Sequence, residues 1–561
     1  MKKILLLLLA CAVKTLCVND GAFDPTFNGG TIVTTGAPSG FVSPLPTAYA
    51  VAVQTDGKIV TAGQDVNGNF QTIRYNTNGS LDTSFNGGIV TLGIGLANGI
   101  ALQPDGKIIV VGTDGPATLS AVMPTRGLKP KATADPNFAV VRYLANGQLD
   151  TSFGNGGIIN NMQGSANSAA LQTDGKIVVA GTLVDNLGNS SYNIVRYLPN
   201  GTIDTTFGGG TGIATAGTPL SNAIGSPPPA ALSVQIQSDG NIITSGGIFN
   251  GALFFYATAR FTTLGALDTS WGGTGIVTVG TGIVPNPAIF PPYAWSLVIQ
   301  PDGKIVTTGF SANEIIITAR FNTNGSPDAT FNGTGIAANV GTNDGFPLGV
   351  VLQNDGKIAI ALEYFDNTNW WFALIRYTST GAADTTFGVN GLLLQNFPFN
   401  FGGVSANALA IQSDGKIVSS GVVVTTLGGN QFFYAVGRYL VANNSLIPTT
   451  INNSSTGLIT INGPTTITGT AQNPSIVTVF FKNGSGTTSL GTVTQANDQW
   501  SLNTGSLPNG TYYISAVNNY KDGNVLLASP SIVLPTNCLG CAIGQKYCGV
   551  TSCSSTGCCP S

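Results

Sequence analysis

The residue types that most often carry acid–base chemistry are scarce in this chain. Its 561 residues include no histidine, and glutamate occurs only as Glu314 and Glu363. The lack of histidine excludes the usual Ser-His-Asp and Cys-His arrangements. Two carboxylates would suffice for glycoside hydrolysis, yet no local motif pairs them outside the repeat described below. The sequence therefore predicts that the chain is not an enzyme and needs no cofactor; a glycan-active enzyme is the alternative.

Metal binding is the other simple chemistry to consider. Oxygen-rich loops occur at 65–69 and 366–369. Neither has the number of carboxylates found in a calcium loop, and ordinary Asx turns account for both. We therefore expect no metal site.

Most arginines and many aspartates recur at a fixed spacing. An arginine is followed at once by an aromatic residue. An aspartate stands eight positions after the arginine (74 and 82 in the first copy), and Phe or Trp stands three positions after the aspartate. This constant spacing predicts a structural ion pair beneath the aromatic ring rather than metal ligands or general bases, because seven equivalent catalytic centres would be unusual. The arginines are Arg74, Arg142, Arg196, Arg260, Arg320, Arg376 and Arg438; the aspartates are Asp24, Asp82, Asp150, Asp204, Asp268, Asp328 and Asp384.

A second motif, Gln-x-Asp-Gly-Lys, stands between two apolar runs in each repeat. It recurs from Asp56 to Asp414, so that 414 − 56 = 358 residues cover six intervals and the period is about 60. Asp-Gly between alternating apolar runs is typical of a tight hairpin with a type I′ turn. The repeats are therefore predicted to be built from β-hairpins.

The two ends of the repeat region complement each other. The seventh copy has its hairpin and Arg438, but no Asp-x-x-Phe follows; that piece stands at 21–30 instead. Half of the last repeat thus stands at the N-terminal end. An open solenoid does not need this arrangement, whereas a β-propeller uses an N-terminal strand to complete its last blade. We therefore predict an all-β fold with a seven-bladed β-propeller over 20–441, closed by residues 21–36.

These units resemble the delta-60 repeat, a propeller-type motif of exported bacterial proteins. The resemblance rests on Gln54 to Ile59 and on Arg74-Tyr75 through Leu81 to Phe85, together with their echoes along 20–441. It implies a propeller, and it implies no activity, because the family carries none that is established.

The N-terminus has the pattern of an export signal, with two lysines before an apolar run at 4–13. We expect residues 1–17 to be a signal peptide. The Leu-Leu-Ala-Cys sequence ending at Cys11 is similar to a bacterial lipobox, which makes Cys11 a candidate for lipidation and for a membrane tether. Ordinary cleavage between 12 and 20 is the alternative.

Two further regions follow the repeats. After a polar linker at 442–456, residues 457–536 resemble a bacterial Ig-like β-sandwich, with short apolar strands, Trp500 and a late Gly-x-Tyr. The tail at 537–561 is rich in cysteine. In an oxidising compartment its even number of cysteines favours disulfides over zinc. The candidates are Cys538, Cys541, Cys548, Cys553, Cys558 and Cys559.

Charge and loop length direct the prediction of function. A net charge of −3 argues against nucleic-acid binding. Strand alternation places the uniform turns of each repeat on one face and the connections of variable length on the other, where binding commonly resides. Aromatic residues near those connections are candidates for ligand binding, with packing beneath the loops as the alternative: Tyr364, Trp370, Trp371, Phe290, Tyr293 and Trp295.

We therefore predict a monomeric binding or adhesion protein, secreted or held on the cell envelope of a bacterium. Its partner would be an extracellular glycan or protein. The alternatives are a glycan-active propeller enzyme and a purely structural envelope protein.

Overall fold

A computed structural model of the chain divides into two compact units, Met1–Ala442 and Asn443–Ser561. In the first unit it describes residues 21–39, 45–115, 136–221, 227–285, 291–311, 315–337, 340, 345–365, 370–395, 401–425 and 431–440. In the second it describes the backbone of the strands alone. The predicted export signal, Cys11, Phe290 and the linker lie outside the described residues.

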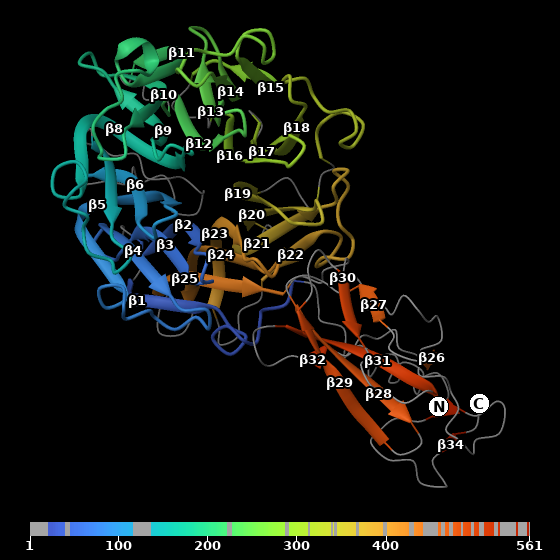
Figure 1. The fold of residues 1–561 in the computed structure, drawn as a ribbon. Coiled ribbons are helices and arrows are strands. Elements are labelled where there is room, and N and C mark those ends of the chain that lie inside the picture. The colour runs from blue at the N-terminus through green and yellow to red at the C-terminus, as the bar shows by residue number, and fades with distance from the viewer. Residues whose placement is uncertain are drawn as a thin grey trace, which may run out of the picture. The chain divides into compact units, whose positions relative to one another are not determined.

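The described part of the first unit consists of strands joined by turns, apart from one short 3-10 helix, η2 (Gly208–Gly210). The strands pair antiparallel in successive groups, and each group ends where the next begins (Figure 1). Two long strands each serve two groups: β5 pairs with β4 through residues 89–94 and with β6 through 95–102, and β8 does the same between β7 and β9.

Groups 1 to 3 contain β2 (Thr47–Val53), β3 (Ile59–Gln64), β4 (Asn69–Tyr75), β5 (Ile89–Leu102), β6 (Ile108–Asp114), β7 (Asn137–Tyr143), β8 (Ile158–Leu171), β9 (Ile177–Val184), β10 (Asn189–Tyr197) and β11 (Ile213–Ser221). Group 4 contains β12 (Ala230–Ile236), β13 (Ile242–Phe249), β14 (Phe254–Phe261) and β15 (Ile276–Ile283). Group 5 contains β16 (Tyr293–Ile299), β17 (Ile305–Phe310) and β18 (Ile316–Phe321). Group 6 contains β19 (Gly345–Leu352), β20 (Ile358–Phe365), β21 (Trp370–Tyr377) and β22 (Leu392–Leu394), and group 7 contains β23 (Phe401–Ile411), β24 (Ile417–Thr425), β25 (Gln431–Tyr439) and β1 (Val33–Ser39).

The N-terminal strand completes the last group. β1 pairs antiparallel with β25, with Val33 opposite Val436, and Phe23 forms a bridge to Tyr439. Group 7 in turn contacts group 1, because the Asn407 amide donates a hydrogen bond of 2.9 Å to the carbonyl of Ala48. The chain of groups therefore closes on itself.

Apolar side chains fill the space between neighbouring groups. Strands carry buried residues on both faces because each sheet is covered on both sides. For example, Tyr192 of β10 packs in one cluster with Val234 and Ile248 of the next group, and its hydroxyl lies 2.8 Å from Thr244 Oγ1. The core of this unit is thus a set of layers between sheets.

The Asp-Gly hairpins differ from the predicted type I′ turn. In the first repeat the Gly57 amide donates to the carbonyl of Gln54. Gly57 has a φ of +82°, whereas Asp56 is not among the described non-glycine residues with positive φ. This is a three-residue loop of a type I turn followed by a glycine bulge. The prediction of type I′ was wrong because the aspartate occupies a position that tolerates negative φ, so only the glycine needs the left-handed region.

The second unit contains strands of its own. β31 pairs with β26, β28 and β32, and β28 also pairs with β29; β27 pairs with β30, and β33 with β34. Their bounds are β26 Leu458–Ile461, β27 Thr466–Thr470, β28 Ser475–Asn483, β29 Gly486–Thr494, β30 Gln499–Asn503, β31 Gly510–Tyr520, β32 Leu526–Leu527, β33 Lys546–Tyr547 and β34 Cys558–Cys559. Across the described parts of both units, we find no helix with the length and apolarity needed to cross a membrane.

Candidate functional site

Each repeated arginine and aspartate meet in the same local arrangement. In group 1, Arg74 Nε lies 2.7 Å from Asp82 Oδ2, and the guanidinium stands 4.6 Å from the centre of the Phe85 ring. Lys58 Nζ lies 2.9 Å from the same carboxylate oxygen. Arg74 Nη1 also donates to the carbonyl of Ala145, which belongs to the next group. The pair therefore fixes one group internally and joins it to its neighbour.

The other groups repeat this geometry. Arg142, Arg196, Arg260, Arg320, Arg376 and Arg438 lie 2.7 to 2.8 Å from Asp150, Asp204, Asp268, Asp328, Asp384 and Asp24 respectively. Each guanidinium stands over the aromatic ring of its repeat. Most of these side chains are buried, Asp268 being partly exposed, and each pair joins a strand to the turn of the same repeat.

These contacts keep the aspartates ionised to low pH. Burial acts to raise the pKa of Asp150, but hydrogen bonds from Ser152 and Lys107 and the charge of Arg142 outweigh it and lower the pKa to about 2. Asp384 has a pKa of about 2 for the same balance of reasons. The ion pairs therefore persist at any ordinary extracellular pH.

The innermost strand of each group carries a β-bulge at an equivalent position. In β2 the register shifts between Ala48 and Ala50. A bulge redirects the extra side chain. The bulged residues are Tyr49, Asn98, Asn167, Leu232, Trp295, Leu348 and Asn407.

Small residues flank every bulge, because neighbouring inner strands approach closely there. A Cβ added to Gly99 would lie 2.8 Å from the carbonyl oxygen of Asn167 in the next group. At Gly349 an added Cβ would lie 3.1 Å from the Cα of Ala408. The close approach of these strands holds the bulged residues in one ring.

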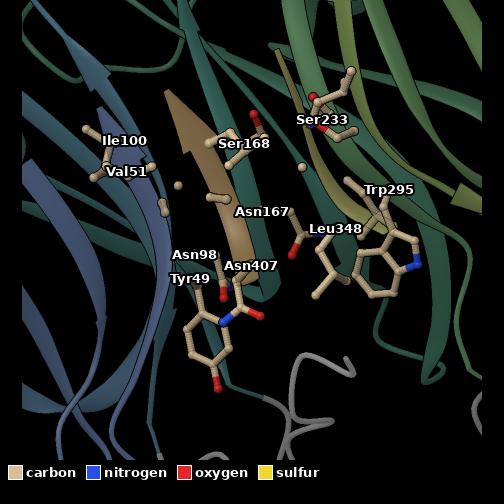
Figure 2. Close-up of a pocket in the computed structure, with 18 of the residues that line it drawn as sticks. Tyr49, Val51, Asn98, Ile100, Asn167, Ser168, Ser233, Trp295, Leu348 and Asn407 are labelled. Atoms are coloured by element: carbon tan, nitrogen blue, oxygen red, sulfur yellow. The ribbon is translucent and has the colours of Figure 1, made fainter. Parts of the chain in front are cut away.

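A cavity of about 670 Å³ runs along the axis of the first unit, and all of the bulged residues line it (Figure 2). Most of its wall comes from β2, β5, β8, β12, β16, β19 and β23, one strand from each group, with Gln64 of β3, Glu363 of β20 and Val422 of β24 behind them. The volume lies within the roughly 300–1,000 Å³ of pockets that hold small ligands. This axial cavity is the candidate functional site.

Asparagines of the ring bridge neighbouring groups. The amide nitrogen of Asn98 donates to the carbonyl of Ala166, and that of Asn167 donates to the carbonyl of Ala231, each at 3.0 Å. The side-chain oxygens differ in their contacts. Those of Asn167 and Asn407 accept from Ser165 and Ser405 hydroxyls.

Two buried polar atoms of the ring have no hydrogen-bond partner in the described structure. They are Oδ1 of Asn98, an acceptor, and Nε1 of Trp295, a donor. Asn98 is 4 % exposed and Trp295 is 9 % exposed. Buried polar groups normally have a partner. Figure 2 draws the indole nitrogen of Trp295 on the side away from Asn98 and Asn407, so Asn98 Oδ1 alone is a candidate contact for a ligand.

The candidate aromatic residues do not form one cluster. Trp295 lines the axial cavity and also packs against Tyr293 in one apolar cluster, their ring centres 5.7 Å apart; the Tyr293 hydroxyl donates to the carbonyl of Pro228. Tyr364 is buried in another core cluster, against which the partly buried Trp371 packs. The side chain of Trp370 lies outside the described residues.

The oxygen-rich loop at 65–69 is satisfied by its own chain. Asp65 accepts hydrogen bonds from the amides of Asn67 and Asn69 and from the Asn69 side chain. Within the described residues, no cluster of three or more His, Cys, Asp or Glu side chains suits a metal ion.

The ring of bulged residues was not predicted from the sequence, although the sequence contains a pattern that marks it. Each bulged residue stands between two small residues or proline, seven positions before the aspartate of the hairpin (49 and 56 in the first repeat, 407 and 414 in the last). The two flanking residues stay small or proline, while the residue between them varies from repeat to repeat. This three-residue pattern could have predicted which residues line the cavity.

Comparison with solved structures finds distant similarity. The extracellular domain of a two component system from B. thetaiotaomicron is 10% identical, with a TM-score of 0.37; the match covers 81% of this chain and only 46% of that one. An ulvan lyase is 14% identical over 72% of this chain and 96% of its own, with a TM-score of 0.39. The polysaccharide lyase Uly1 is 10% identical over 76% and 98%, with a TM-score of 0.35. No curated protein matches the chain.

These structures correct one prediction. The inference from residue types that the chain is not an enzyme was wrong, because similar solved structures include polysaccharide lyases. At such low identity they show the fold family alone and assign no reaction to this chain.

A family model gives the more direct result. Residues 54–85, 133–153, 172–207, 300–331 and 353–387 match the family described as "Domain of unknown function (DUF5122) beta-propeller". Each of these segments contains one of the Arg–Asp pairs described above, and all but 133–153 also contain an Asp-Gly hairpin. The described chain is thus all-β, and five of its segments are similar to this β-propeller family.

Proposed function

We propose that this chain is an exported binding protein whose β-propeller takes a glycan or protein ligand at its axial cavity. The observation that carries the proposal is the ring of bulged residues. Every group contributes its bulged side chain to a single cavity, and Asn98 among them carries a buried oxygen without a partner.

The ring lies near one end of the inner strands. Tyr49 is the third residue of β2, while the Asp-Gly turn follows the last residue of that strand. The bulges therefore stand toward the face that carries the connections of variable length. A ligand would enter from that face, where loops can differ without disturbing the scaffold.

The wider architecture is part of the same proposal. The strand groups are the seven blades of a closed propeller, with β1 as the closing strand. Residues 457–536 are an Ig-like spacer, and the cysteine-rich tail is cross-linked by disulfides. The export signal at 1–17 takes the chain to the cell envelope or beyond, either free or tethered through a lipid on Cys11.

An array of glycans and bacterial surface proteins, probed with the full secreted chain, tests the binding proposal. Leu348→Trp places a larger side chain in the cavity wall, so we expect it to abolish binding. Leu264→Trp is the matched control, because Leu264 is 64 % exposed in one of the uniform turns, on the face opposite the variable connections. It should bind as the unmodified chain does.

Thermal unfolding of both variants shows whether the fold is kept. Binding that survives Leu348→Trp in a folded protein would place the ligand outside the cavity. An array without any bound ligand would refute the proposal altogether.

A further inference from the structure

The ring of bulged residues has two chemically distinct sides. Groups 7, 1, 2 and 3 contribute Asn407, Tyr49, Asn98 and Asn167, and groups 4, 5 and 6 contribute Leu232, Trp295 and Leu348. Figure 2 shows Tyr49, Asn98 and Asn407 together, with Trp295 and Leu348 across from them. Hydrogen-bonding groups thus face an apolar, aromatic wall.

The described wall of the cavity contains no cation. No Lys or Arg lines it, and Glu363 is its one acidic side chain. Desolvation raises the pKa of Tyr49 well above its ordinary value, so its hydroxyl stays neutral. An anionic ligand would lose its hydration here without gaining a counter-charge, which is strongly unfavourable.

The polar side of the ring offers an acceptor to a ligand. Asn98 Oδ1 has no hydrogen-bond partner in the described structure. The orientation of Asn98 is fixed, because its amide nitrogen is engaged with Ala166. A hydroxyl group of a ligand can donate to this oxygen.

We propose that the ligand is a neutral saccharide, with one pyranose ring against Trp295 and its hydroxyl edge toward Asn98. This inference rests on the proposed function and specifies its ligand class. A pyranose has an apolar C–H face suited to an indole and a rim of hydroxyls suited to amides, which is the division that the ring displays. The size of the cavity suits a short oligosaccharide or the end of a longer chain.

Isothermal titration of the full chain with neutral trisaccharides (cello-, manno-, xylo- and maltotriose) tests the inference, with trigalacturonate as the anionic counterpart. We expect at least one neutral trisaccharide to bind and trigalacturonate to bind at least about tenfold more weakly. Equal or tighter binding of trigalacturonate would overturn the inference.

Two asparagine variants form a matched pair. Asn98→Leu and Asn167→Leu each remove an equivalent bond to the next group, at Ala166 and Ala231. Only Asn98 has an oxygen without a partner, because that of Asn167 accepts from Ser165. Asn98→Leu should weaken binding about tenfold, and Asn167→Leu less than about threefold. Equal effects in folded proteins would exclude a direct contact at Asn98.

Variants of Trp295 test the contact with its aromatic face. Trp295→Phe keeps a smaller aromatic face, so binding should weaken less than about tenfold. Trp295→Leu loses the aromatic face and should weaken binding further. Unchanged affinity in both would refute the stacking position.

The failure of this inference is distinguishable from that of the proposed function. If only proteins or peptides bind, and Leu348→Trp blocks them, the cavity is a binding site but the saccharide class is wrong. If no probe binds at all, both fail.

Discussion

The repeated Arg–Asp pairs show how few charges are needed to hold a large all-β unit together. Asp82 is 4 % exposed, and its carboxylate receives Arg74, Lys58 and the Ser84 hydroxyl. A buried charge retained with this many partners is costly to disturb, because removing one side leaves the other uncompensated. Much of the small charge content of the chain is thus engaged in its structure.

Asp82→Asn should destabilise the first unit by about 3–5 kcal/mol, because Arg74 and Lys58 would lose a buried counter-charge. Asp56→Asn in the same repeat is the control, since Asp56 is exposed in a turn that asparagine also favours. Urea unfolding followed by circular dichroism measures both. Similar unfolding free energies for the two variants would contradict the structural role of the pair.

The stability of the propeller should depend on pH only in acid. The pKa values of Asp150 and Asp384 are lowered to about 2 in the folded chain, while an unfolded aspartate has a value of about 3.9. A depressed pKa contributes stability above the unfolded value that is lost as the pH falls through the folded one. Urea unfolding should give a nearly constant free energy down to about pH 5 and a decline from pH 4 to 2. A constant value throughout would contradict this.

At the scale of elements, the N-terminal strand is the feature that closes the ring. Asp24 and Arg438 lie 414 positions apart in the chain (438 − 24), yet their side chains are 2.8 Å apart. β1 is not continuous in the chain with the other strands of group 7, so this contact and the pairing of β1 with β25 hold it in place. The closing segment therefore depends on its contacts more than any other strand.

Asp24→Asn should detach the closing segment, whereas Asp384→Asn should not, because the residues around Asp384 are connected covalently to their blade on both sides. Limited proteolysis with N-terminal sequencing should show faster cleavage within 21–39 in Asp24→Asn only. Equal protection of this segment in both variants would show that pairing of β1 alone is sufficient.

The elements also show what sequence reasoning could reach. Fixed spacings predicted the hairpins, and the offset of the first half-repeat placed residues 21–36 beside the last repeat, where β1 lies. The turn type was missed because Asp-Gly fits two kinds of loop, and the backbone at Asp56 decides between them. The bulges were missed because they arise from pairing between strands, which simple alternation along one strand does not contain. Alternation alone puts Tyr293 and Trp295 on the same face, yet only Trp295 lines the cavity.

At the scale of the whole molecule, the repeats differ most where their inner strands meet. The outer part of each group is nearly invariant in its ion pair and aromatic ring, while the ring of bulged residues changes from asparagine to leucine to tryptophan. The Arg–Asp pairs repeat from group to group, whereas the bulged residues vary, so we expect ligand specificity to depend on the bulged residues. This pattern is the main support for a ligand in the axial cavity.

Hydrogen–deuterium exchange of the full chain, with and without the tightest-binding saccharide, tests whether a ligand binds in the axial cavity. Each inner segment, such as 47–53 of β2 or 95–102 of β5, pairs on one side only, so its other edge is open toward the cavity. We expect ligand-dependent protection in peptides covering 45–53, 96–102 and 293–299, with none in the uniform turn at 262–266. Protection confined to outer turns, or no protection anywhere, would contradict binding in the axial cavity.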